Sequence, residues 1–348
     1  MTRTSSSSAS SAPSRFDLRE IYRPIERELA TATDTLRARL GGGDATLDGY
    51  LDYTFQLGGK RLRPALLLLA AQSWGGVERR CYLCAAALEM IHTGSLVHDD
   101  ILDGARFRRQ LETVNTKWDS HRAVLIGDLL ITRAFDLICE CDDSVIFQKV
   151  SQYCQATVEG ELFQTDAIGN FELTVDDYRR IVGGKTASLI ECATFLGGYL
   201  AGARDAELDD FARFGRTIGM AFQIVDDALD LIGDERTVGK TLGSDLANQK
   251  ETLPLIHYFQ SASSGDAAAL RARLANGVTN ADRTEIAELL RDAGAVEASY
   301  ADADALIADS LELLTSLEER GRKLGRPVNG DSFASLASLA QFVVQRNK

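Results

Sequence analysis

The sequence predicts an all-α protein built as one large helical bundle. Apolar residues recur every three or four positions through most of the chain, as at Leu83, Ala87, Met90 and Ile91, which is the spacing of one helix face. Alternating runs of β-branched residues, which would indicate strands, are hard to find. Only 5 of the 348 residues are proline, which breaks helix interiors. These observations together favour about a dozen helices around one core.

Glycine and aspartate clusters divide the chain into these helices. Residues 1–14 are Ser-rich and of low complexity, and we expect a disordered tail; a transit peptide would need a basic amphipathic helix close behind it. Residues 15–348 contain no evident linker and are expected to form a single all-α domain. The predicted helices span residues 17–40, 46–56, 62–73, 78–102, 118–140, 145–167, 176–201, 206–232, 252–260, 265–275, 281–293, 296–321 and 332–346.

Composition and charge narrow the function class. The formal net charge is −13, which argues against a general nucleic-acid-binding surface, because such a surface would be basic. No apolar run approaches the ~20 residues that a transmembrane helix needs, so we expect no transmembrane segment. The 6 cysteines include two closely spaced pairs in apolar helical stretches, and no secretory signal precedes them. We therefore expect buried free thiols and a cytoplasmic protein.

Two copies of the pattern DDxLD, at residues 99–103 and 226–230, each end a long apolar helix. In each copy the first and last aspartates are four positions apart and share a helix face. A solvated helix end is the simpler explanation, but carboxylates next to a core are costly unless a cation compensates them. Carboxylate oxygens suit Mg²⁺, which prefers a few carboxylates together with water and phosphate oxygens. The candidate metal ligands are Asp99, Asp100, Asp103, Asp226, Asp227 and Asp230.

Basic residues follow the same regions of the chain. Lys60 and Arg63 come after a glycine pair at the start of a helix, a position that favours anions. His92 precedes Asp99 by two turns on nearly the same face, although a lone histidine there is also typical of a core. Any one of these residues alone could belong to a solvated loop, but together they predict a site for two diphosphates. The other candidates are Arg108, Arg109, Lys185, Lys240 and Lys250.

The ordered motifs GGKRLRP, HTGSLVHDDILD, RR, GKT, FQIVDDALD and GK resemble those of the trans-isoprenyl diphosphate synthases, the polyprenyl synthetase family. The resemblance extends over roughly residues 20–345. It implies an isoprenoid synthase fold, in which the helices surround a central cavity, and usually a homodimer. It also implies a Mg²⁺-dependent prenyltransferase that condenses isopentenyl diphosphate with an allylic diphosphate.

The resemblance assigns a role to each motif residue. The first aspartate cluster would hold two Mg²⁺ ions, and the second, chiefly through Asp226, a third. The isopentenyl diphosphate site would comprise Lys60, Arg63, His92 and Arg109. The allylic diphosphate site would comprise Arg108, Lys185, Thr186, Gln223, Lys240 and Lys250. The catalytic residues would be Asp99, Asp103, Lys185, Thr186, Gln223 and Asp226.

Product length is expected to depend on Gly94 and Ser95, which precede Asp99 by about one turn. An aromatic residue at this point in the family closes the cavity and gives farnesyl or geranylgeranyl diphosphate. Both residues are small here, which favours a long-chain all-trans product, from hexaprenyl to decaprenyl, whose tail ends near Phe135 or Phe147. The alternatives are that Gly94 and Ser95 only allow close helix packing, and that the product is geranylgeranyl or farnesyl diphosphate.

Two departures from the short-chain members bear on these assignments. The segment between Lys240 and Asp245 is one residue longer here, so the match of these two residues to the family motif is weaker. Glu161 and Gln164 stand where short-chain members carry Gln and Asp, and this pattern resembles long-chain members more closely.

Two other function classes remain as alternatives. A class I terpene cyclase shares the aspartate-rich helices but usually lacks the GGKR element and His92. A non-catalytic subunit of a two-component synthase typically loses aspartates, and both clusters are complete here.

Overall fold

The protein is represented by a computed structural model that describes residues 17–57, 59–232 and 243–345. The Ser-rich segment 1–14 and Lys240 lie outside these residues. The first half of the fold comprises α1 (Leu18–Tyr22), η1 (Arg23–Ile25), α2 (Glu26–Leu40), α3 (Ala45–Gln56), α4 (Leu62–Trp74), α5 (Arg79–Leu102), β1 (Phe107–Arg108), β2 (Leu111–Glu112), α6 (Val114–Lys117), α7 (Ser120–Cys139) and α8 (Ser144–Asp166).

The second half is also helical. It comprises α9 (Val175–Val182), η2 (Gly183–Ala187), α10 (Ser188–Leu200), α11 (Ala206–Ile232), α13 (Ser244–Ala247), α14 (Leu253–Ser261), α15 (Ser264–Ala275), α16 (Asn280–Asp292), α17 (Ala295–Lys323) and α18 (Gly330–Gln345). The all-α prediction is therefore confirmed, and the expected helix ranges agree with these bounds to within a few residues. No helix among the described residues has the length and apolar character required to cross a bilayer.

Aspartate caps explain why several helices begin where they do. The Asp119 side chain accepts a hydrogen bond from the Arg122 N–H at the start of α7. The Asp143 side chain does the same for the Val145 N–H at the start of α8. Each cap satisfies a backbone N–H that has no partner within the helix.

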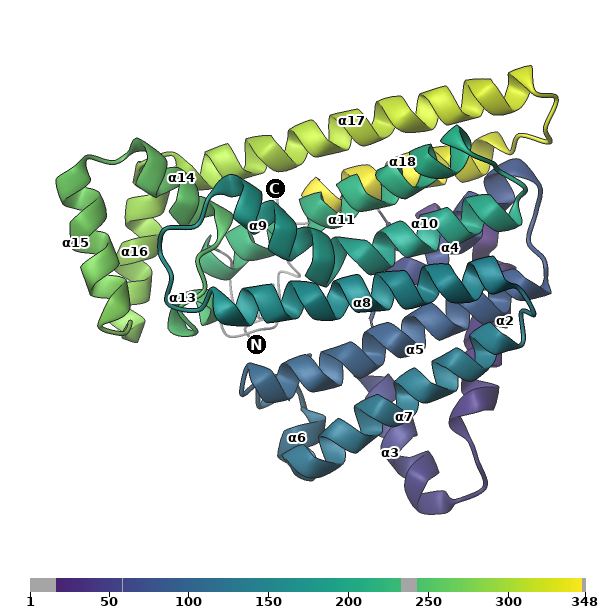
Figure 1. The fold of residues 1–348 in the computed structure, drawn as a ribbon, viewed down its shortest axis with the longest axis horizontal. Helices are drawn as coiled ribbons and strands as arrows, with labels where there is room; N and C mark the ends of the chain where they lie inside the picture. Colours follow the sequence, from purple (N-terminus) through teal and green to yellow (C-terminus); the bar gives the residue numbers. More distant parts are fainter. Residues whose placement is uncertain (1–16, 58, 233–242, 346–348) are drawn as a thin grey trace, which may run out of the picture.

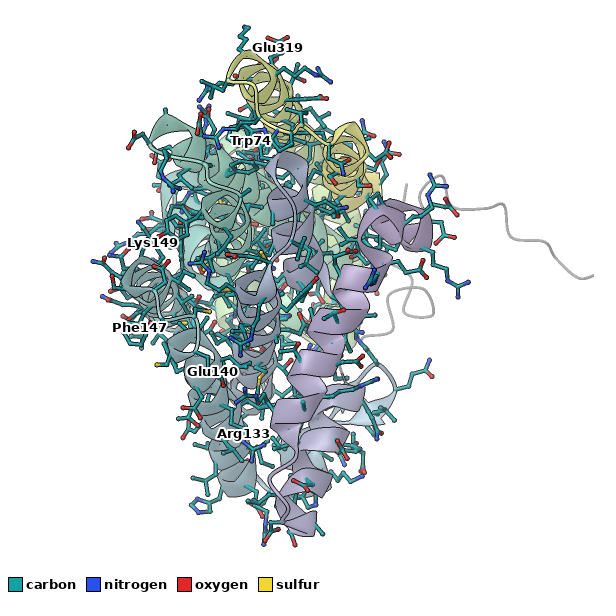
Figure 2. The ribbon with its side chains drawn as sticks, turned by 90° about the vertical axis from the view of Figure 1, so that its right-hand side faces the viewer. Trp74, Arg133, Glu140, Phe147, Lys149 and Glu319 are labelled. Carbon is teal, nitrogen blue, oxygen red and sulfur yellow. The ribbon has the colours of Figure 1, made fainter. Side chains whose placement is uncertain are left out.

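α4, α5 and α10 form the centre of the core, and their side chains are largely buried. α5 packs against α7 on one side and against α4 and α10 on the other. Figure 1 shows α17 along one long edge of the bundle and α13–α16 gathered at one end. A second apolar cluster, which includes Leu255, Leu270 and Ile286, fills this end. Figure 2 shows Trp74 inside the bundle, whereas Phe147 and Lys149 lie at its outer edge.

Several local features differ from the sequence prediction. A 3₁₀ turn at Pro24 divides the predicted helix 17–40. A two-stranded hairpin pairs Phe107 with Glu112, and no strand was expected there. Its turn residues Arg109 and Gln110 have φ of 51° and 67°, as a type I′ turn requires. Cys139, expected to be buried, is exposed because it lies at the end of α7.

Candidate functional site

The two aspartate clusters meet at one end of the bundle. Asp99 and Asp103 lie at the end of α5, and Asp226 and Asp230 lie near the end of α11. Lys250, which follows α13, spans the space between the two helix ends, since its Nζ lies 2.8 Å from Asp103 Oδ1. The fold thus brings together two motifs that are far apart in the chain.

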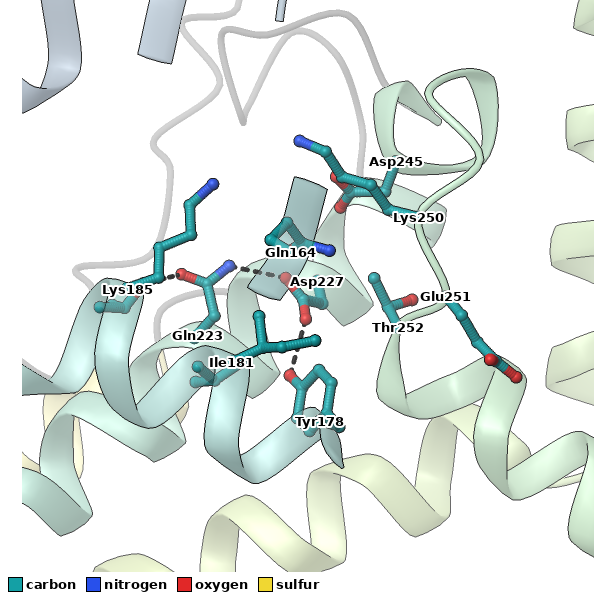
Figure 3. A pocket seen from close by; sticks show the side chains of 12 residues that line it. Gln164, Tyr178, Ile181, Lys185, Gln223, Asp227, Asp245, Lys250, Glu251 and Thr252 are labelled. Atoms are coloured by element: carbon teal, nitrogen blue, oxygen red, sulfur yellow. Dashed lines mark hydrogen bonds between the residues drawn. The ribbon is translucent and has the colours of Figure 1, made fainter. Parts of the chain in front are cut away.

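The first of two described pockets lies beside the second aspartate cluster, and we call it the aspartate pocket (Figure 3). It is lined by Gln164, Tyr178, Ile181, Val182, Lys185, Thr186, Gln223, Asp227, Asp245, Lys250, Glu251 and Thr252. Residues from α8, α9, η2, α11 and the α13–α14 connection therefore share one surface.

A hydrogen-bond chain crosses the aspartate pocket. The Thr186 hydroxyl donates to Gln223 Oε1 over 2.8 Å, and Gln223 Nε2 donates to Asp227 over 2.7 Å. Tyr178 donates its hydroxyl proton to the same carboxylate over 2.6 Å. Burial raises the pKa of Asp227 well above its usual range, and the nearby charge of Asp245 adds to this. Asp227 thus orients Gln223, and through it Thr186, toward the pocket.

Lys185 enters the aspartate pocket from η2, a π-helical turn that interrupts the predicted helix 176–201. α8 and η2 pack in close contact at Gly160. A Cβ on this residue would lie only 2.2 Å from the backbone nitrogen of Lys185 and 2.7 Å from the carbonyl carbon of Gly184. Lys185 Nζ lies 2.6 Å from Glu161 Oε2 on α8. A π-turn displaces the side chains that follow it, and such turns are common at functional sites.

Several charged groups act on the Asp99 carboxyl at the end of α5. Burial raises the pKa of Asp99 to about 6, with Glu161 and Asp103 adding to the rise and Lys185 opposing it. An additional positive charge beside Asp99 would lower this pKa and favour the ionised carboxylate. The region between the two helix ends is therefore suited to a cation held between carboxylates.

The second pocket lies between α3, α5 and the β1–β2 hairpin, and we call it the arginine pocket. It is lined by Thr54, Leu57, Gly59, Glu89, His92, Thr93, Leu96, Val97, Asp100, Arg108 and Arg109. Arg108 forms a bidentate pair with the buried Asp100, with Nη2 at 2.8 Å from Oδ1 and Nε at 3.0 Å from Oδ2. The Arg109 guanidinium lies against Gly59, where a Cβ would be 2.6 Å from its Nη2. The hairpin thus closes over the glycine-rich turn.

Positive charge dominates the arginine pocket. Burial and the neighbouring charges of Arg63 and Arg108 keep the pKa of His92 well below its usual range, so its ring is neutral. Burial lowers the pKa of Arg63 to about 10, and its buried Nε has no hydrogen-bond partner within the described structure. The buried Glu89 carboxylate pairs with Arg61 over 2.7 Å. The arrangement favours a bound anion, because an anion could satisfy the Arg63 Nε–H.

The structure separates the predicted residues into groups. Lys185, Thr186, Gln223 and Lys250 line the aspartate pocket, and His92 and Arg109 line the arginine pocket. Arg108, assigned from the motif to the allylic diphosphate, lies in the arginine pocket.

Lys60 and Asp230, both predicted site residues, line neither pocket. Lys60 is exposed and its Nζ lies 4.8 Å from the centre of the Phe342 ring. The Asp230 carboxylate accepts hydrogen bonds from the Ser244 hydroxyl and the Asp245 N–H, both over 3.0 Å, and so anchors α13.

The carboxylates of the two clusters fit a Mg²⁺ ion that is coordinated jointly by protein and substrate oxygens. Over the residues that the structure covers, no three carboxylate, imidazole or thiolate groups come together in one metal site. Asp100 is engaged by Arg108 and Asp103 by Lys250. The hard oxygens of Asp99, Asp103 and Asp226 could supply only part of a coordination shell, and Mg²⁺ usually completes its shell with water and phosphate oxygens.

Several site residues were not predicted from the sequence. Glu89 had a signal, because a glutamate within the apolar run of α5 is costly to bury without a partner. Arg61 lies between the two predicted basic residues of its motif and was passed over. Tyr178 and Glu251 had no signal, because their roles come from contacts between separate helices.

Comparison with known proteins gives a consistent result. Residues 44–292 match the family described as Polyprenyl synthetase. The chain is 34% identical over 301 residues to an all-trans-nonaprenyl-diphosphate synthase (geranyl-diphosphate specific) from Rhodobacter capsulatus, covering 86% of this chain and 92% of that protein. It is 32% identical over 311 residues to a geranylgeranyl diphosphate synthase from Saccharolobus solfataricus, covering 87% and 91%.

Solved structures share the fold. A polyprenyl synthase from Caulobacter crescentus CB15, crystallised with calcium and isoprenyl diphosphate, superposes with a TM-score of 0.87 at 29% identity. The match covers 95% of this chain and 98% of that one. The relatives include makers of both long and short prenyl chains, so similarity alone does not give the product length.

Proposed function

Because the chain belongs to the polyprenyl synthetase family and is a trans-prenyltransferase, we propose that it condenses isopentenyl diphosphate with an allylic diphosphate in two adjoining pockets. The family resemblance and the enzyme class predicted from the motifs are confirmed. The observation that carries the proposal is the pair of cation-lined pockets, one beside the second aspartate cluster and one lined by Asp100 of the first.

The arginine pocket is the proposed site of isopentenyl diphosphate. Arg63 and Arg109 supply positive charge, and the neutral His92 ring can donate one hydrogen bond without adding charge. The unpaired Arg63 Nε supports this assignment, because a diphosphate oxygen would satisfy it. Arg108 lines the same pocket, so we propose that it faces both substrates while it holds Asp100.

The aspartate pocket is the proposed site of the allylic diphosphate. Lys185 and Lys250 both contact carboxylates across this pocket, Glu161 and Asp103 respectively. A diphosphate and its cations would enter between these pairs. Asp99, Asp103 and Asp226 are the proposed Mg²⁺ ligands, with Asp227 and Asp230 in supporting positions. Bound Mg²⁺ would neutralise the negative charge that develops on the departing diphosphate.

The protein's own groups then determine which reaction occurs. The Thr186 hydroxyl oxygen and the Gln223 carboxamide, held in orientation by Asp227, present dipoles to the electron-deficient allylic carbon. Holding isopentenyl diphosphate in the arginine pocket places its double bond beside that carbon. We assign the final proton transfer to the departing pyrophosphate, as the resemblance to the family implies.

We propose a long-chain product, with geranylgeranyl diphosphate as the second candidate. The support is the absence of an aromatic side chain at Gly94 and Ser95. The two positions differ in their surroundings. A Cβ on Gly94 would lie 2.9 Å from the Gly127 carbonyl oxygen on α7, which makes Gly94 a packing position. Ser95 is half-buried, with its hydroxyl donating to the His92 carbonyl, and is the proposed determinant of length.

We also propose a homodimer. Of the thirteen large apolar side chains that are exposed within the described part of the chain, six lie on α7 and α8: Val124, Leu125, Val145, Phe147, Val158 and Leu162. A second copy would cover them. Light scattering should give about twice the 37.9 kDa chain mass, and Leu125→Lys should lower it.

Incubation of the purified chain with labelled isopentenyl diphosphate, farnesyl diphosphate and Mg²⁺ tests the function. Chromatography of the dephosphorylated products should show labelled polyprenols, and EDTA should abolish them reversibly. A cyclic hydrocarbon formed without label would identify a terpene cyclase. No turnover at saturating Mg²⁺ would identify a non-catalytic subunit.

A further inference from the structure

The side chains of the consecutive residues Lys250 and Glu251 point in opposite directions. Figure 3 shows the Lys250 side chain directed across the aspartate pocket and the Glu251 side chain directed away from it. Lys250 reaches Asp103, and its side chain is 9% exposed. Glu251 is 3% exposed, and its Oε2 accepts a hydrogen bond from the Leu173 N–H over 2.7 Å. A buried carboxylate is retained only where it has strong partners, so this contact needs an explanation.

The contact joins the α8–α9 connection to the segment that carries Lys250. Gly169 in this connection donates its N–H to the Gln249 carbonyl over 3.0 Å. Arg271, from α15, donates a hydrogen bond to the Phe171 carbonyl over 2.7 Å. Its positive charge also lowers the pKa of the Glu251 carboxyl, against the larger effect of burial. Residues on both sides of Lys250 are thus tied to one connection.

The backbone next to Lys250 needs such ties. Gln249 has a φ of 53°, in the left-handed region that non-glycine residues rarely adopt. A residue in this conformation persists only when its surroundings hold it there. Within the segment, the Lys250 N–H donates to the Asp245 carbonyl over 2.9 Å, which is a local contact only. The Glu251–Leu173 hydrogen bond ties a side chain of this segment to another element.

We propose that Glu251 is a positioning residue for the allylic diphosphate site. By accepting the Leu173 N–H, it fixes the backbone from which Lys250 extends toward Asp103. This inference rests on the proposed function, because it assigns Lys250 to the allylic diphosphate. Glu251 itself does not contact the substrate and acts only through Lys250.

Steady-state kinetics of four variants test the inference. Glu251→Leu removes the acceptor and should raise the farnesyl diphosphate KM about tenfold, a loss typical of one displaced charged contact. The isopentenyl diphosphate KM should change less than about twofold. Glu251→Gln keeps an acceptor oxygen and should remain near wild type. Glu172→Leu, in the same connection but exposed, is the matched control and should leave both KM values unchanged.

A double-mutant comparison separates positioning from a general structural role. In a Lys250→Ala background, Glu251→Leu should add less than about twofold to the farnesyl diphosphate KM, because the residue acts through Lys250. An undiminished effect in that background would overturn the inference, as would an unchanged KM in Glu251→Leu or an equal loss in Glu251→Gln. If Glu251→Leu does not fold, Glu251→Ala provides the same comparison.

The same variants distinguish this inference from the function on which it rests. If Lys250→Ala raises the farnesyl diphosphate KM and Glu251→Leu does not, only the positioning role fails. If Lys250→Ala leaves that KM unchanged, the assignment of the allylic site itself is wrong.

Discussion

In the proposed function, single carboxylates at the end of α5 carry the metal requirement. Asp99 has a pKa raised to about 6 by burial, so its ionised form is destabilised until a cation binds beside it. Asp99→Ala should lower kcat by about two to three orders of magnitude, as expected for removal of one group that stabilises developing charge. The helical fold should be unchanged by circular dichroism. Asp176→Ala, whose side chain is 92% exposed, is the control; near-normal turnover of Asp99→Ala at saturating Mg²⁺ would refute the metal assignment.

Glu251 predicts a pH dependence of stability. Burial raises its pKa to about 7, above the usual value for a glutamate. The folded state therefore binds more protons than the unfolded state between these two pKa values, so the free energy of unfolding falls as pH rises through that range. Glu251→Gln should remove a fall of about 2 kcal/mol between pH 5 and pH 8. Urea denaturation of both proteins at the two pH values measures it, and identical pH profiles would contradict the raised pKa.

At the scale of helices, the crossing of α8 with η2 determines the position of Lys185. Because a Cβ on Gly160 would lie 2.2 Å from the Lys185 nitrogen, Gly160→Ala must separate the two elements. We expect a loss of about 1–3 kcal/mol in stability, as for overpacked cores, together with reduced kcat. Gly49→Ala in α3, where no atom lies within 4 Å of the added Cβ, should be neutral or slightly stabilising. Thermal melts and turnover of the two variants compare them, and equal behaviour would contradict the close crossing.

Helices were predictable from the sequence because their signals are local. Asp119 and Asp143 cap helices within three residues, and apolar spacing marks each buried face. The glycine pair Gly183-Gly184 indicated a kink in the helix, but the close crossing with Gly160 of α8 appears only in the tertiary structure. The hairpin before α6 was missed because its strands have only two residues each. Motif spacing indicated most of the site, whereas the roles of Tyr178, Glu89 and Glu251 required the tertiary contacts.

At the scale of the whole molecule, the path of the growing chain decides product length. Gly94→Tyr would collide with α7, where Ile131 Cγ1 lies 3.0 Å from the added Cβ, so the substitution would test packing as well as length. Ser95→Tyr is the cleaner change. It should shift the dephosphorylated products toward farnesol or geranylgeraniol in chromatography, while the first condensation is largely spared. A distribution unmoved by Ser95→Tyr would place the end of the cavity elsewhere.

The proposed function requires that the aspartate pocket and the arginine pocket hold two different diphosphates. Measurement of both KM values in Arg109→Ala and Lys185→Ala tests this requirement. A charge-assisted phosphate contact contributes about 1.5–3 kcal/mol, so each variant should lose roughly ten- to a hundredfold in the KM of one substrate. We predict that Arg109→Ala raises the KM of isopentenyl diphosphate and Lys185→Ala that of the allylic diphosphate. The reverse pattern, or an equal loss for both substrates in both variants, would show that the two pockets do not bind the substrates as proposed.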